Sequence, residues 1–187
     1  MGGTIALQVS VPIEATEEGD VNIPVRVEPC VGTPDRVEYR WDADTDILSA
    51  VVRVPEEAVR PKATALELEG SDGSWLILDV RGGRIQGVEV AVWPDVRKRP
   101  DLAPPPEVED GTVIVGAVEQ GKRLAVEVNT RLQAEADRTE RTIHFRLGAT
   151  RETRTVRIAR DLLVDVDRRD RMAGLWLLDV PPFPDEP

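Results

Sequence analysis

The sequence predicts an all-β protein of two tandem, similar halves, each an antiparallel meander with hairpins and little helix, packed about a pseudo-two-fold axis. Apolar and polar residues alternate along most of the chain, which is the period of a strand buried on one face. Turn sequences such as Gly-Ser-Asp-Gly-Ser at 70–74 separate the alternating segments. A stretch of the first half, 76–94, also returns in similar form at 162–182.

The first half comprises residues 1–95 and consists of alternating segments divided by polar turns. One helical turn is expected at 55–61, because Pro55 can open it and Pro61 ends it. The predicted strands are residues 5–11 and 21–27, two within 36–54, and then 63–70, 74–80 and 84–93.

A proline-rich linker at 96–110 divides the halves, since five prolines fall between Pro94 and Pro106 and favour an extended chain. The second half, 111–182, opens with a hairpin predicted at 112–129. Residues 131–142 have a helical composition between alternating flanks; we favour strands with a polar turn, and helix stays open. Strands at 153–166 and 172–180 follow, and a loose tail at 183–187 ends the chain.

The two similar stretches predict matching hairpins. Gly82-Gly83 favours a two-residue turn in which Val80 faces Ile85, and a three-residue loop at 168–170 makes Val166 face Met172. In this register Asp79 faces Gln86, and Asp165 faces Ala173. Each hairpin then has one apolar face, formed by Leu76, Leu78, Val80 and Ile85 in the first and by Leu162, Val164, Val166 and Met172 in the second.

Three polar or variable positions in these hairpins need an interpretation. Asp79 and Asp165 correspond, and we expect both to accept hydrogen bonds from turn amides rather than form a paired acid site. Glu89 falls on the apolar face in this register and corresponds to Trp176, which indicates a sheet margin. Gly87 and Gly174 correspond as well and favour a bulge or close packing.

The charge pattern bears on partners. A net charge of −11 argues against nucleic-acid binding. The window 141–171 is nevertheless basic, with nine arginines against five acidic residues. The simplest interpretation is a solvated strand face; the alternative is a contact surface for an acidic protein or for a second copy in a homodimer. The candidate contact residues are Arg151, Arg154, Arg157, Arg168, Arg169 and Trp176.

Several chemical motifs are missing from the sequence. Asp42, Asp44 and Asp46 resemble the start of a calcium loop, but Ile47 and Arg53 occupy positions where glycine and glutamate are needed, so these aspartates are weak metal candidates. Cys30 and His144 are single in the chain. We therefore expect no catalytic residue, no metal site and no cofactor, and we expect a protein that is not an enzyme.

The location and function follow from the same composition. No apolar window is long enough for a membrane span and the N-terminus lacks a secretion signal, so we expect a cytoplasmic protein. The leading hypothesis is a non-enzymatic interaction or structural module. The alternatives are a small-ligand binder with a tryptophan-lined pocket between the halves, and a metal-dependent hydrolase that uses the aspartates.

Two blocks of the chain resemble a small prokaryotic family, domain of unknown function 2283. The fuller copy spans about 37–94 and the partial copy about 143–182. The matching residues are Trp41 in place of a tyrosine, Asp42, Asp46, Leu48, Asp79, Ile85, Gly87, Val88 and Glu89, and then Asp165, Asp167, Met172, Gly174 and Leu175. The second copy departs at Trp176. The resemblance implies a compact β-rich module, associated with partner binding, and carries no established activity.

Overall fold

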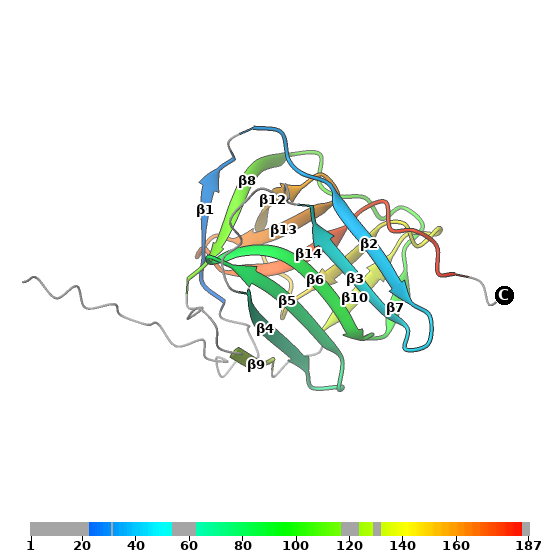
Figure 1. The fold of residues 1–187 in the computed structure, drawn as a ribbon. Coiled ribbons are helices and arrows are strands. Elements are labelled where there is room, and N and C mark those ends of the chain that lie inside the picture. The colour runs from blue at the N-terminus through cyan, green and yellow to red at the C-terminus, as the bar shows by residue number, and fades with distance from the viewer. Residues whose placement is uncertain (1–22, 31, 54–62, 117–123, 129–131, 185–187) are drawn as a thin grey trace, which may run out of the picture.

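The computed structural model describes residues 23–30, 32–53, 63–116, 132–184 and the backbone of 124–128. These residues form fourteen β-strands and no helix (Figure 1), which confirms the all-β class. The strand predicted at 5–11, the start of that at 21–27 and the helical turn at 55–61 lie outside the described residues. The described part of the chain contains no helix of the length and apolar character that a membrane crossing requires.

The strands belong to one curled sheet with two arms. The first arm is antiparallel apart from its last pair, in which β9 runs parallel to β4. In sheet order it contains β2 (Val37–Asp42), β3 (Ile47–Val52), β6 (Arg84–Val92), β5 (Trp75–Arg81), β4 (Ala63–Gly70) and β9 (Leu124–Val128).

The second arm is antiparallel except that β7 runs parallel to β10. In sheet order it contains β7 (Val96–Lys98), β10 (Gln133–Ala136), β11 (Ile143–Arg146), β14 (Met172–Leu177), β13 (Leu162–Asp167) and β12 (Thr153–Ala159). β8 (Val108–Val115) runs parallel to β12 of the second arm. It also joins the first arm, because its Ile114 pairs with Arg84 of β6. β1 (Val25–Pro29) pairs with β8.

The two arms do not correspond to the two predicted halves of the sequence. β9, from the second half of the sequence, extends the first arm, whereas β1, from the first half, pairs with β8. The hairpin predicted at 112–129 is therefore wrong, because its two strands pair with different neighbours. Alternation identifies a strand and its buried face, but it does not identify the partner. The pseudo-two-fold axis stays a prediction.

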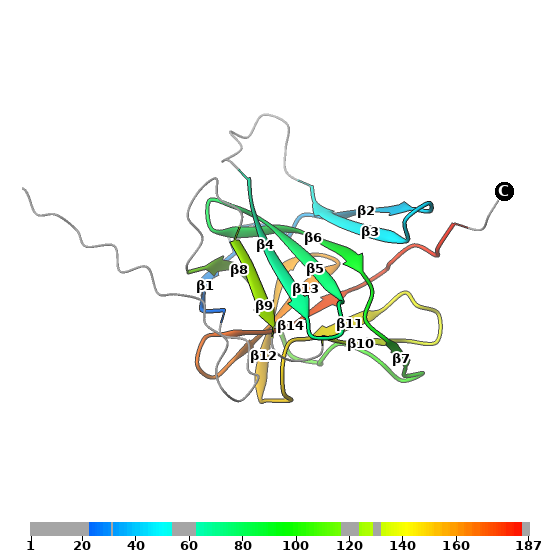
Figure 2. The same cartoon turned by 90° about the horizontal axis from the view of Figure 1, so that it is seen from below.

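The core lies between the two arms, which face each other when the molecule is viewed from below (Figure 2). Leu48 and Val90 of the first arm and Phe145 and Leu175 of the second belong to one apolar cluster. The eight side chains assigned to the apolar hairpin faces are all buried, so the prediction of which side faces inward is confirmed. Burial of alternating Leu, Val and Ile residues on both arms is the main force that holds the curl closed.

The hairpin registers agree with the prediction only next to the turns. Val80 pairs with Ile85, and Val166 pairs with Met172. A bulge follows in each hairpin, so Asp79 pairs with Gly87 and Asp165 with Gly174, one residue beyond the predicted partners.

The bulge also changes the assignment of Glu89. This residue pairs with Ile77 and Ser49 and is half-buried on the outer face, so its assignment to the apolar core face is wrong. Close approach explains both glycines: a Cβ at Gly174 would lie 2.7 Å from the Phe145 carbonyl oxygen, and one at Gly87 3.0 Å from that of Ala50.

The predicted linker is built into the second arm. Residues 96–98 form β7 beside β10, and residues 108–110 already pair with β12. The chain between them passes from one edge of the arm to the other and buries Leu102 against Leu163 and Trp176. The segment 131–142 contains β10 and a turn, so the preferred strand interpretation is confirmed for its described residues.

Candidate functional site

The arginines proposed as a contact surface are paired within the chain. Arg154 contacts Glu109 at 3.1 Å and Asp170 at 3.0 Å, Arg157 contacts Asp110 at 3.1 Å, and Arg168 contacts Glu152 at 2.5 Å. These pairs join β12 to the neighbouring β8 and connect loops of the second arm, so the surface alternates in sign. Arg169 is exposed, and its backbone amide donates to Asp167.

Arg151 is a structural residue. Its guanidinium lies 3.1 Å from the Asp167 carboxylate and donates to the Met172 carbonyl at 2.9 Å, and its side chain is 14% exposed. Asp167 also accepts the turn amides of Arg169 and Arg171 at 2.9 Å each. Burial raises the pKa of Asp167, but the hydrogen bonds from Arg171 and Arg169 outweigh it and hold the pKa below its ordinary value. Asp167, and not Asp165, is thus the aspartate that closes the turn.

Trp176, the last contact candidate, is buried in a polar cluster on the outer face of the second arm. Its indole nitrogen donates to Asp165 Oδ2 at 3.0 Å, and the His144 Nε2 lies 2.9 Å from the same oxygen. Thr155 donates to Asp165 Oδ1 at 2.6 Å. The rings of His144 and Trp176 stack with centroids 4.0 Å apart. Asp165 therefore accepts from three strands, and its prediction as a turn ligand is wrong.

This polar cluster is closed to substrate. Leu102 covers Trp176 and Leu163 from outside, and Glu135, which pairs in register with His144, forms an ion pair with Arg99 at 3.0 Å. Each polar group has a partner, and the one hydroxyl of the cluster, that of Thr155, is buried and donates to Asp165. The cluster fixes the relative positions of β11, β12, β13 and β14.

The aspartates considered for a metal lie in the exposed turn between β2 and β3. The Asp42 carboxylate accepts from the Asp44 amide at 3.1 Å, and Asp46 adopts a positive φ of 57°. Asp79 forms an ion pair with Arg81 at 3.1 Å. In the described part of the chain, no three side chains of His, Cys, Asp or Glu come together as metal ligands would.

Trp41 of β2 and Trp93, directly after β6, pack together. Trp41 stacks on Trp93 with centroids 5.8 Å apart and meets Phe183 edge-on at 5.0 Å, so the tail covers this cluster. Trp41 also donates to the Pro181 carbonyl at 3.0 Å, and the Tyr39 hydroxyl donates to that of Leu178 at 2.8 Å. These contacts attach the C-terminal segment to β2 through aromatic side chains that are partly buried and hydrogen-bonded at their polar ends.

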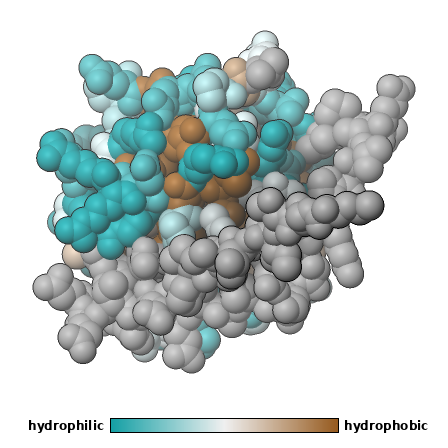
Figure 3. All heavy atoms as spheres, turned by 90° about the vertical axis from the view of Figure 1, so that its left-hand side faces the viewer, coloured by the Kyte–Doolittle hydropathy of each residue, from teal (hydrophilic) through white to brown (hydrophobic). Residues whose placement is uncertain are grey.

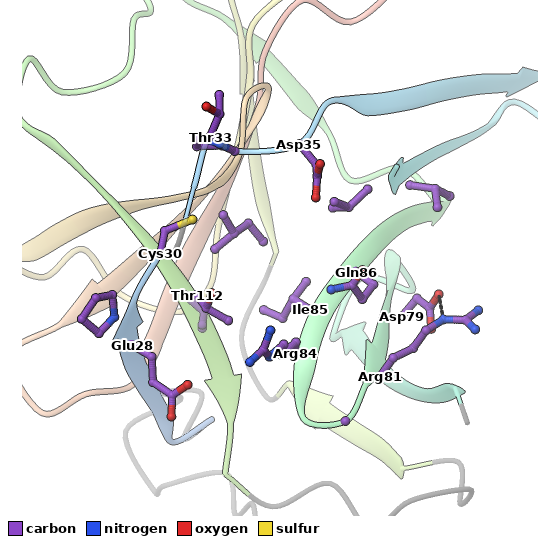
Figure 4. A pocket seen from close by; sticks show the side chains of 17 residues that line it. Glu28, Cys30, Thr33, Asp35, Asp79, Arg81, Arg84, Ile85, Gln86 and Thr112 are labelled. Atoms are coloured by element: carbon purple, nitrogen blue, oxygen red, sulfur yellow. Dashed lines mark hydrogen bonds and ion pairs between the residues drawn. The ribbon is translucent and has the colours of Figure 1, made fainter. Parts of the chain in front are cut away.

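A groove of about 600 Å³ opens where β6 and β8 diverge beyond their single pair (Figure 4). Residues of both arms form it, together with β1 and the loop at 33–35. Its apolar lining consists of Pro29, Pro34, Val51, Val52, Ile85, Val113 and Ile158. Its polar lining consists of Glu28, Cys30, Thr33, Asp35, Asp79, Arg81, Arg84, Gln86 and Thr112, beside the backbone of Gly82.

Two opposite charges in the groove have no ion-pair partner among the described residues. Glu28 pairs with Arg26 at 2.7 Å, and Asp79 pairs with Arg81. Asp35 and Arg84 are both exposed. In Figure 4 they lie at opposite ends of the cavity, with Ile85 between them.

The groove has the composition of a binding site. Its lining contains no histidine, and Cys30, whose thiol lies 3.8 Å from the Gly32 carbonyl oxygen, has no base beside it. The volume falls in the range of small-ligand sites, which combine apolar walls with a few polar groups. The face on which β1 and β8 lie carries a hydrophobic area bordered by hydrophilic residues (Figure 3).

This groove is not evident from the sequence. Its lining comes from segments as far apart as Glu28 and Ile158, and Gly82-Gly83 and Arg84 were interpreted as a hairpin turn alone. The expected pocket between the halves was to be lined by tryptophans, whereas no tryptophan is among the groove residues. The available signals are an arginine directly after a Gly-Gly turn and a Pro-Asp dipeptide at 34–35, which the sequence does not place near each other.

Comparison with known proteins gives no family for the chain. No family model matches it, and no curated protein matches it either.

Proposed function

We propose that this chain is a non-enzymatic binding module and that the groove between β1, β3, β6 and β8 is its binding site. The observation that carries the proposal is a pair of opposite charges, Asp35 and Arg84, in a cavity with an apolar wall; neither has an ion-pair partner among the described residues. Solvated charges at the mouth of a cavity have no internal ion pair to break when a ligand of complementary charge binds.

The residues of the groove favour binding over catalysis. General acid–base chemistry needs a group with a suitable pKa within reach of the reacting atom, and nucleophilic chemistry needs a base next to the nucleophile. The lining provides carboxylates, guanidinium groups and a thiol, but no such adjacent pair. The hydrolase hypothesis would require Asp42, Asp44, Asp46 or Asp79 to act together, and Asp79 is on a different strand from the turn that holds the others.

A homodimer in the cytoplasm remains part of the proposal. β2 and β7 each pair on one side only, and exposed strand edges favour association. An acidic partner for the basic window is less favoured, because Arg154, Arg157 and Arg168 are paired within the chain. Sedimentation velocity over a concentration range tests the dimer, and a single monomeric species at all concentrations would remove it.

Membership of the domain-of-unknown-function 2283 family is also proposed. The orders β2–β3–β6–β5–β4 and β10–β11–β14–β13–β12 are the same, and both hairpins place their bulge after an aspartate, Asp79 or Asp165. This agreement supports an internal duplication of one β-rich module.

Cys30 allows a direct test of the binding proposal. It is the single cysteine of the chain and lines the groove, so a small trifluoromethyl tag on its thiol reports on the groove by fluorine NMR. We expect at least one member of a mixed panel of metabolites and short peptides to shift this signal. A matched control carries the tag on the exposed face of β12, through Cys30→Ser and Thr153→Cys. Equal shifts at both positions, or none at Cys30 across the panel, would refute the proposal.

A further inference from the structure

We propose that the ligand of the groove is a zwitterion with an apolar body, namely a short peptide of a few residues with both termini free. This inference rests on the proposed binding role of the groove and names the ligand class. It comes from the placement of one carboxylate and one guanidinium at opposite ends of a single cavity.

The two charges are set by rigid parts of the fold. Arg84 follows the Gly82-Gly83 turn, whose glycines have φ values of 56° and 79°, and its backbone is held in β6 by pairing with Arg81 on one side and Ile114 on the other. Asp35 lies in the loop between β1 and β2, and its carbonyl oxygen accepts the Arg160 amide at 2.7 Å. The backbones of both residues are therefore fixed before a ligand arrives.

The residues between Asp35 and Arg84 indicate the chemical character of the middle of the ligand. In Figure 4 the Asp35 carboxylate points into the cavity from one end, Arg84 lies at the other, and Ile85 lies between them. Val51, which is 48% exposed, adds apolar surface to the lining. A free amino terminus matches Asp35, a free carboxylate matches Arg84 and can accept two hydrogen bonds from it, and an apolar side chain matches the wall.

Other ligand classes fit this groove less well. A phosphate-rich ligand would face Glu28, Asp35 and Asp79 as well as the net charge of −11. A metal ion lacks a group of three ligands in the described residues. A wholly apolar ligand would bury Asp35 and Arg84 without partners, which is costly.

The volume gives an upper limit to the part of the ligand that the groove can hold. A cavity of about 600 Å³ is larger than a single amino acid requires and within the range that small-molecule sites occupy. An extended tripeptide spans roughly 10 Å, at 3.3–3.6 Å per residue. We therefore use alanyl-leucyl-alanine as the probe.

The experiment compares four forms of this tripeptide: both termini free, the amino terminus acetylated, the carboxyl terminus amidated, and both blocked. Binding is followed by isothermal titration calorimetry and by the Cys30 tag. We expect the free form to bind at least about tenfold more tightly than either singly blocked form, since a charge-assisted hydrogen bond is lost with each block.

Substitutions at Arg84 and Asp35 test which of the two side chains binds which terminus of the peptide. Arg84→Gln should remove the preference for a free carboxylate and leave the preference for a free amino terminus, and Asp35→Asn should do the reverse. Arg97→Gln and Asp101→Asn change the same charges at exposed positions outside the groove, and should leave both preferences intact. Arg84→Lys keeps the charge but not the two parallel hydrogen bonds, so it should retain part of the carboxylate preference that Arg84→Gln loses; this partial rescue separates charge recognition from misfolding.

The outcomes distinguish this inference from the proposed function. Equal affinity for the free and the blocked peptides, or binding of none of the four forms at millimolar concentration, overturns the zwitterion inference. The proposed function survives that result if another member of the panel shifts the Cys30 signal selectively. It fails together with the inference if no member does.

Discussion

Replacement of Asp165 by alanine is expected to destabilise the fold strongly. Asp165 is 6% exposed, and its carboxylate accepts hydrogen bonds from Thr155, Trp176 and His144. Alanine leaves three donors without an acceptor, and a buried donor that loses its partner costs about 1–3 kcal/mol. His144 can reach some water, because its side chain is 14% exposed. We therefore expect a loss of about 3–5 kcal/mol in the free energy of unfolding.

Asparagine at the same position should cost less. Its side-chain oxygen can accept from Trp176 and His144, and its amide can donate to the Thr155 hydroxyl, so shape and bonding are kept while the charge is lost. Charge-assisted hydrogen bonds are roughly twice as strong as neutral ones, so we expect Asp165→Asn to lose about 1–2 kcal/mol.

Urea denaturation, followed by circular dichroism, measures these free energies. Asp79→Ala is the matched control, because Asp79 occupies the corresponding hairpin position but forms a partly exposed ion pair with Arg81. Such pairs contribute about 0–1 kcal/mol. A loss below about 1 kcal/mol for Asp165→Ala, or equal losses for the two alanine variants, would refute the interpretation of Asp165 as the centre of a buried network.

Three further outcomes are expected. Leu102→Ala should lower the free energy of unfolding by about 2–3 kcal/mol and increase iodide quenching of tryptophan fluorescence, since Leu102 covers Trp176; unchanged quenching would contradict this cover. The fold lowers the pKa of Asp167, so this residue stabilises the protein at pH values above its unfolded-state pKa and loses that contribution as the pH falls through its folded-state pKa. In the Asp167→Asn variant, the free energy of unfolding should therefore decrease less steeply as the pH is lowered. Burial and the nearby Asp161 and Asp179 raise the pKa of Tyr39, the single tyrosine, above the ordinary tyrosine value. The stability of the fold should therefore fall as the pH rises through the folded-state pKa of Tyr39. Near-ultraviolet titration of the tyrosinate band measures this pKa.

The fold class and the inner faces of the hairpins were predictable from the sequence. Alternation is a local property, and burial of Leu78 or Val164 follows from the side of the strand on which it lies. Gly87 and Gly174 indicated a bulge or close packing, and the structure shows both. The shifted register was not predictable, because it depends on a contact across strands: Gly174 lies against the Phe145 carbonyl, and that contact requires β11 to be its neighbour.

Partner assignment was the main limit. The segment 112–129 has the sequence of a hairpin, yet β8 and β9 pair with β12 and β4, because parallel pairing with distant strands extends both arms. The proline-rich segment likewise looked like a free linker, whereas Leu102 places it against the second arm. Long-range pairing of this kind leaves no periodic signal in one sequence.

The candidate site was the least predictable part. Arg154 and Arg157 stand out in the sequence because their acidic partners, Glu109 and Asp110, lie far away in the chain. The same distance conceals Asp35 and Arg84, which the fold places in one cavity. Charge in a sequence therefore shows which residues can bind, and pairing in the structure shows which remain free to do so.

Residue-resolved NMR of the full chain tests the central claim most directly. The chain is labelled with nitrogen-15 and titrated with the panel members that shift the Cys30 tag. We predict that the amide signals of Arg84, Gln86, Thr112 and the loop at 33–35 move and saturate together, while those of Arg154, Arg157 and Arg168 stay in place. Saturating shifts confined to the surface around these three arginines, with the groove unchanged, would contradict the assignment of the groove as the binding site.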